Sequence, residues 1–163
     1  MKRKKMLFLL FVSVLVGCAA PAPTQPPMQE DLPMTNSIHA DVLTVDATGD
    51  VNDYQFAVKV SSPDTGCDQY ADWWEVLSED GQLLYRRVLL HSHVGEQPFT
   101  RSGGPVPIGE NKIVIIRAHM NTGGYGGAAL RGSASGGFET VQLESGFAAD
   151  VEALPPLPED CAF

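Results

Sequence analysis

Residues 73–92, WWEVLSEDGQLLYRRVLLHS, decide the fold class of this chain. Asp80-Gly81 is the strongest short-range signal for a β-hairpin turn, and apolar residues flank it on both sides. A two-residue loop places Ser78 opposite Leu83, which sets the register of the two arms. The cross-strand pairs that follow are Trp73 with Val88, Trp74 with Arg87, Glu75 with Arg86, Val76 with Tyr85, and Leu77 with Leu84. These pairs include an ion pair, a Trp–Arg stack and aliphatic contacts. The turn signal and the cross-strand pairs therefore both indicate a hairpin.

Other stretches also read as strands, with turn residues between them. Four apolar residues alternate with less apolar ones over 54–61, the period of a half-buried strand. The continuous apolar run 113–116 predicts a strand buried on both faces. The expected strands are 38–46, 54–61, 73–78, 82–92, 112–120, 138–143 and 147–151. Without an amphipathic helix, about seven short strands predict an all-β domain, a single β-sandwich for which an immunoglobulin-like arrangement is one candidate.

The N-terminal residues are basic and then apolar. Lys and Arg occupy positions 2–5, and positions 6–16 form an apolar run of 11 residues. This is the anatomy of a secretory signal, and the run is shorter than the roughly 17–25 residues of a membrane-spanning helix. We therefore expect residues 1–17 to be a removable export signal and the mature chain to have no membrane span.

Leu15-Val16-Gly17-Cys18 ends this run. These four residues resemble the lipobox of bacterial lipoproteins, and the resemblance covers the first 18 residues. It implies that Cys18 becomes the first mature residue and carries the acyl chains that hold the protein on a membrane. Ala19, in place of Asp, resembles the default for outer-membrane lipoproteins that face the periplasm. The alternative is an ordinary secretory signal with a cysteine near the cleavage site.

The composition divides the rest of the chain into a tether and a domain. Residues 19–37 contain five prolines and few large apolar side chains, which favours an extended spacer. We expect residues 18–37 to be the lipidated cysteine and tether, and residues 38–163 to be the β-sandwich. The proline-rich stretch 154–161 predicts an extended C-terminal strap. The 146 residues that follow the signal suffice for one domain.

Two cysteines follow Cys18 in the sequence, Cys67 and Cys161. In an oxidising compartment two such thiols predict one structural disulfide. A redox-active pair is the alternative, but the C-x-x-C spacing typical of that chemistry is absent.

The mature chain is strongly acidic. The signal holds four of the 11 basic residues and none of the 20 acidic ones, which leaves a charge of 7 − 20 = −13. This sign argues against binding nucleic acid through a broad basic face. The expected partners are the membrane, through the lipid anchor, and either an envelope protein or a small anionic ligand.

Three histidines suggest a metal site. His91 and His93 are two residues apart, which places both side chains on one face if the strand continues through them. His119 could supply a third nitrogen if its strand pairs with theirs, and three imidazoles suit zinc or copper. The alternative is that these histidines make ordinary hydrogen bonds.

A second candidate site is the polar stretch Arg101-Ser102-Gly103-Gly104, which we expect to form a loop. Backbone amides near two glycines can form an anion-binding nest, and an arginine can grip a carboxylate or phosphate. The alternative is that the arginines of the chain pair with its many carboxylates.

The remaining features favour binding over catalysis. The glycine-rich stretch 121–137 suggests a recognition loop. Asp72 and Glu75 beside two tryptophans are consistent with a sugar- or peptidoglycan-acting enzyme, although the hairpin register assigns Glu75 to Arg86. Common nucleophile, metalloprotease and nucleotide motifs are missing. The sequence therefore predicts a binding or structural module without a cofactor.

Overall fold

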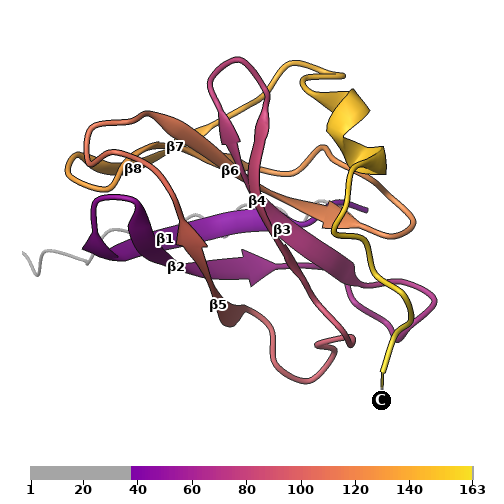
Figure 1. Ribbon diagram of the computed structural model, residues 1–163. Coiled ribbons are helices and arrows are strands. Elements are labelled where there is room, and N and C mark those ends of the chain that lie inside the picture. Colours follow the sequence, from indigo (N-terminus) through magenta and orange to yellow (C-terminus); the bar gives the residue numbers. More distant parts are fainter. Residues whose placement is uncertain (1–37, 163) are drawn as a thin grey trace, which may run out of the picture. The chain divides into compact units, whose positions relative to one another are not determined.

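The computed structural model describes residues 38–162 (Figure 1). The expected export signal, Cys18 and the tether up to residue 37 lie outside the described residues. The described part contains eight β-strands and one short 3₁₀ helix. No helix within residues 38–162 is long and apolar enough to span a bilayer.

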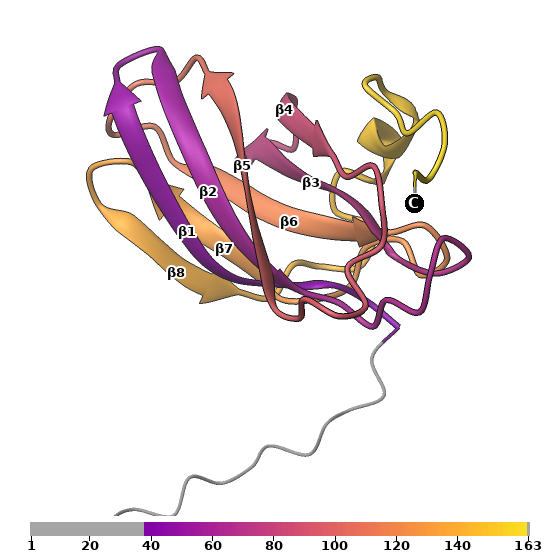
Figure 2. The same ribbon diagram turned by 90° about the horizontal axis from the view of Figure 1, so that it is seen from below.

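The strands form two antiparallel sheets that pack face to face (Figure 2). The first has the order β1-β2-β5 and the second β4-β3-β6-β7-β8. The bounds are β1 Asp41–Asp50, β2 Asp53–Ser61, β3 Ala71–Ser78, β4 Leu83–Val88, β5 Phe99–Val106, β6 Val114–Met120, β7 Ala129–Ser133, β8 Gly137–Val141, and helix η1 Ala149–Ala153. The expected all-β sandwich is confirmed, with eight strands in place of about seven.

The strand order is immunoglobulin-like. Strands β1, β2 and β5 share one sheet, and β3, β6 and β7 share the other, as strands A, B, E and C, F, G do in immunoglobulin domains. The fourth strand pairs with β3 instead of joining the first sheet, and β8 extends the second sheet beyond β7.

Alternating residues of each sheet fill the space between the layers. Phe56, Val58 and Val60 of β2 are fully buried there, and they face Trp74 and Ile116 of the opposite sheet across the same core. All seven residues of β6 are buried, as the apolar run predicted. A second apolar cluster covers the other face of this sheet, where helix η1 packs against it: Leu77, Ile115, Ala129 and Val151.

The hairpin register is confirmed away from the turn and differs beside it. Trp73, Trp74, Glu75 and Val76 have the expected partners, but Leu77 pairs with Leu83 and not with Leu84. The loop explains the difference. The Gly81 amide donates to the Ser78 carbonyl and the Ser78 amide to the Gln82 carbonyl, so three residues form the loop and a bulge restores the register. Gly81 has a φ of +86°, as such a loop requires.

Two other expected elements are wrong. The second hairpin arm ends at Val88, so residues 89–92 lie outside the strand. Residues 147–151, expected as a strand, form a turn followed by helix η1. The backbone leaves the extended region at Gly146 and Ala148, which have φ values of +82° and +46°.

The predicted disulfide between Cys67 and Cys161 is confirmed, with the two Cα atoms 5.6 Å apart. It joins residues that are 94 positions apart in the sequence. The bond ties the C-terminal strap to the loop between β2 and β3.

Candidate functional site

A buried cluster of charged residues lies on the outer face of the five-stranded sheet. Glu75 of β3 is fully buried between Arg86 of β4 and Arg117 of β6, its neighbours in the sheet. Arg86 donates to Glu75 Oε2 through Nε at 2.9 Å and Nη2 at 2.7 Å, and Arg117 donates to Oε1 through Nε at 2.8 Å. The expected Glu75–Arg86 ion pair is thus part of a three-residue network.

The two arginines also hold the C-terminal segment over the sheet. Arg86 Nη2 donates to the Val151 carbonyl at 2.8 Å. Arg117 donates to the carbonyls of Phe147 and Ala148 at 2.6 and 2.9 Å. Glu75 offsets part of the charge of the two guanidiniums, which lowers the cost of burying them while their outer N–H groups bind this segment. Glu75 therefore positions the arginines, and both of its oxygens are occupied.

Trp73 lies beside this network with an aromatic partner and a cation. The Arg86 guanidinium is 4.4 Å from the Trp73 ring centroid, and the His119 ring stacks on Trp73 at 3.7 Å. This Arg–Trp contact replaces the expected one between Arg87 and Trp74, since Trp74 points into the core and packs on Tyr85.

His119 forms a short hydrogen bond with Asp72, whose oxygen lies 2.6 Å from Nδ1. Burial raises the pKa of Asp72, and the bond to His119 opposes that rise. The other ring nitrogen, Nε2, is buried and makes no hydrogen bond within residues 38–162. It points toward Glu152, 3.5 Å away. Asp72 is thus already engaged, which does not favour it as a free catalytic acid.

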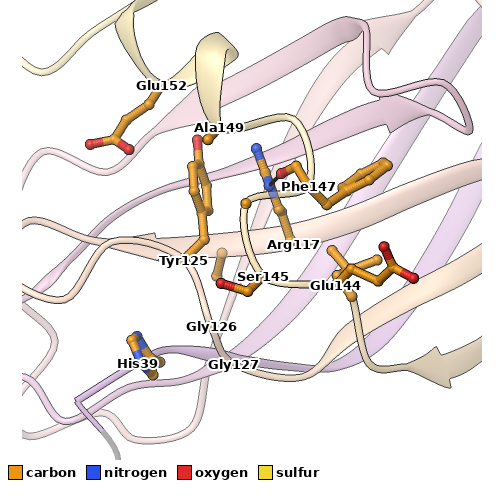
Figure 3. A pocket seen from close by; sticks show the side chains of 13 residues that line it. His39, Arg117, Tyr125, Gly126, Gly127, Glu144, Ser145, Phe147, Ala149 and Glu152 are labelled. Carbon is orange, nitrogen blue, oxygen red and sulfur yellow. Dashed lines mark hydrogen bonds between the residues drawn. The ribbon is translucent and has the colours of Figure 1, made fainter.

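A pocket of about 550 Å³ opens beside this cluster (Figure 3). Four segments form its walls: residue 39 ahead of β1, the end of β6, the glycine-rich stretch after it, and residues 143–152. Arg117 and Tyr125 lie side by side in the pocket, with the guanidinium 3.5 Å from the ring centroid. The lining residues are His39, Arg117, Ala118, Tyr125, Gly126, Gly127, Leu143, Glu144, Ser145, Gly146, Phe147, Ala149 and Glu152.

Tyr125 provides a hydroxyl group at the centre of the site. Burial, followed by the charge of Glu75, raises the pKa of Tyr125 to about 12. The phenol is therefore protonated at neutral pH and accepts a hydrogen bond from Trp73 Nε1 at 3.3 Å. A hydrogen bond to Glu75 is a further cause of the raised pKa, and the phenol oxygen keeps acceptor capacity for a ligand.

The structure separates the three histidines that the sequence suggested as metal ligands. Strand β3 lies between β4 and β6, so the strand that carries His119 does not pair with the hairpin arm before His91 and His93. His91 and His93 lie beyond β4, with ring centroids 4.6 Å apart, and His93 stacks on Phe99. Residues 38–162 contain no group of three or more His, Cys, Asp or Glu side chains that could hold a metal ion.

The expected ligand loop at Arg101, Ser102, Gly103 and Gly104 belongs to strand β5, so the loop assignment is wrong. Its backbone pairs with β2, and Arg101 forms an ion pair with Glu96 at 2.7 Å. Gly103 allows a close approach, because a Cβ atom there would overlap Tyr85 and Trp74 of the opposite sheet. That packing requirement explains a glycine inside a strand.

The glycine-rich stretch 121–137 contains a strand and part of the pocket wall. Its later part forms β7, and its earlier part, up to Gly127, supplies a wall of the pocket. Sequence reasoning pointed to this stretch but not to Tyr125 within it. It also missed residues 143–152, whose position depends on hydrogen bonds to distant arginines.

One similar protein is informative. A protein from Halomicrobium mukohataei named "Putative lipoprotein" is 44% identical over 102 residues, which is 62% of this chain. The chain spans 45% of the length of that relative. No protein-family profile and no solved structure matches. The similarity supports a lipoprotein.

Proposed function

We propose that the protein is a membrane-anchored lipoprotein whose β-sandwich binds a small cationic ligand in the pocket of Figure 3. Cys18 carries the lipid, and residues 18–37 hold the sandwich outside the cytoplasm, at the outer membrane in a cell with two membranes. The observation that carries the proposal is the pocket itself, which lies beneath a segment fastened by Arg86 and Arg117.

The size and construction of the pocket suit a small molecule. Its volume of about 550 Å³ lies within the roughly 300–1,000 Å³ of pockets for such ligands. The buried network around Glu75 fixes two of its walls, the β6 side and residues 147–148. A wall fixed before binding lowers the conformational entropy that a ligand must offset.

The charge balance favours a cation. Arg117 is the one arginine in the pocket lining, and it shares the carboxylate of Glu75 with Arg86. Glu144 and Glu152 also line the pocket and are exposed, so the lining contains two carboxylates and one guanidinium. The net negative charge of the chain attracts cations over long range. Tyr125 and Ser145 offer hydroxyl groups for the polar part of the ligand.

Glucosamine and N-acetylglucosamine test this proposal, because they share a ring and differ in the charged amine. We expect NMR titration of the full chain to show saturable glucosamine binding at pocket residues, and weaker binding of the neutral compound. Glu152→Gln should weaken glucosamine binding several-fold, since it removes one charge from a half-exposed position.

The matched control is Glu139→Gln, an exposed residue of β8 outside this pocket, which should leave binding unchanged. Equal binding of the charged and neutral sugars, with no effect of Glu152→Gln, would contradict a cation site. If neither sugar nor 1,4-diaminobutane shifts the pocket resonances, the proposed function is wrong.

A further inference from the structure

A second, smaller cavity lies where the edges of the two sheets meet. Strand β4 is an edge of the five-stranded sheet, and β5 is an edge of the three-stranded sheet. Arg87 of β4 and Arg101 of β5 both line this cavity, which has a volume of about 90 Å³. The other lining residues are Leu89, Leu90, His91 and His93. Two arginines from different sheets thus line one small space.

The cavity also contains a buried imidazole without a hydrogen-bond partner. The His93 side chain is 1% exposed, and within residues 38–162 neither ring nitrogen makes a hydrogen bond. Its backbone amide donates to Asp64 Oδ2 at 2.7 Å, which fixes the residue in place. The same carboxylate oxygen is 3.8 Å from Nδ1, beyond hydrogen-bond range. Buried polar groups are ordinarily paired, so this ring is a candidate donor to a ligand.

Arg87 is held in an orientation that leaves donors free. Its Nε donates to the Ser102 carbonyl and its Nη1 to the Val88 carbonyl, each at 3.1 Å. The bond to Ser102 joins the edges of the two sheets, the bond to Val88 stays within β4, and neither uses Nη2. A guanidinium that is oriented in advance loses less entropy when it binds an anion.

We propose that this cavity binds one phosphate-type oxyanion, held by Arg87, Arg101 and His93. Guanidinium groups match the oxygens of a phosphate in geometry as well as charge. The volume is far below the roughly 300–1,000 Å³ of a drug-sized ligand, so it accommodates a single small group. The site is separate from the Tyr125 pocket and does not depend on the function proposed there.

Glu96 controls access to Arg101. Its carboxylate pairs with Arg101 at 2.7 Å and is 59% exposed. Exposed ion pairs are weak because water competes for both partners. An oxyanion in the cavity therefore displaces Glu96, which moves into solvent. Removal of its charge should strengthen anion binding, whereas removal of the arginine charge should weaken it.

Calorimetric titration of the full chain with inorganic phosphate at constant ionic strength tests the proposal. We expect saturable binding with a Kd of about 1 mM or below. Arg101→Gln should weaken binding about tenfold or more, the effect of losing a charged hydrogen bond. Glu96→Gln should tighten it, and this exposed variant remains informative if the arginine variants fold poorly. Arg131→Gln is the control, because that exposed arginine pairs with Glu79 on the other side of the sheet.

Absence of saturable phosphate binding would overturn the proposal, as would equal weakening by Arg101→Gln and Arg131→Gln. A lack of tightening in Glu96→Gln would also count against it. Nanodiscs containing phosphatidylglycerol identify the source of the phosphate group. Binding to them that Arg101→Gln abolishes supports a lipid headgroup, and phosphate binding without nanodisc binding supports a free anion in the same site.

Discussion

Glu75 contacts both arginines that fasten the C-terminal segment, so one carboxylate organises interactions on three strands and on helix η1. Its two oxygens are fully buried and each accepts from a guanidinium. Replacing such an ion network with apolar residues can be neutral, but removing one member leaves uncompensated charge in the interior. The structure has two guanidiniums that depend on this residue.

We therefore expect Glu75→Ala to lower the free energy of unfolding by about 3–5 kcal/mol. Urea denaturation of the full chain measures this loss. Glu79→Ala is the matched control, because Glu79 pairs with Arg131 at the surface of the same sheet. The control should change stability by about 1 kcal/mol or less. A similar loss of unfolding free energy in the two variants would mean that the buried network contributes no more to stability than the surface ion pair.

The disulfide and the strap it holds act at the scale of the elements. The bond between Cys67 and Cys161 closes a loop of 94 positions that contains β3 to β8. Cross-linking reduces the entropy of the unfolded chain, and the effect grows slowly with loop length. The same bond keeps the segment after helix η1 near Arg86, whose Nη1 donates to the Leu154 carbonyl.

The double variant Cys67→Ser, Cys161→Ser should lose about 4–5 kcal/mol of stability by the chain-entropy estimate. Guanidinium denaturation of the oxidised protein and of the double variant gives the difference, and reduction of the native protein should reproduce it. A loss below about 1 kcal/mol would show that the bond is strained or that the unfolded chain is already compact.

Local signals predicted the elements that depend on neighbouring residues. The central residue pairs of the hairpin follow from the alternation of apolar residues and from the Asp80-Gly81 turn signal. Both signals lie within residues 73–92. The error beside Gly81 arose because a three-residue loop with a bulge uses the same Asp-Gly signal as a two-residue loop. The strand predicted for residues 147–151 was wrong because Ala148 adopts a left-handed backbone conformation, which an alanine side chain does not favour.

The site was less predictable than the fold because its parts are distant in the sequence. Arg117 meets the carbonyls of residues 147 and 148 about thirty positions later, and Tyr125 packs on that arginine. The periodic pattern of apolar residues in a sequence does not predict such long-range contacts. The glycine run directed attention to one wall of the pocket, whereas the histidines and Arg101 attracted attention by residue type and local spacing, which do not show which distant residues meet.

At the scale of the whole molecule, the proposed lipid anchor can be tested directly. We expect intact-mass measurement of protein extracted from native membranes to give a chain that begins at Cys18 and carries acyl chains. Cys18→Ala should lack that added mass and leave the membrane fraction. A full-length, lipid-free chain in the cytosol, with Cys67 and Cys161 as free thiols, would contradict the lipoprotein assignment.

The tip of the hairpin rests on the segment that covers the outer sheet face. A Cβ atom at Gly81 would lie 2.9 Å from Cβ of Ala148, the residue whose carbonyl Arg117 holds. A larger side chain at position 81 would force this segment to shift, and Phe147 and Ala149 of the same segment line the pocket. The hairpin tip and the ligand site cannot therefore evolve independently, and related sequences should co-vary at positions 81 and 148.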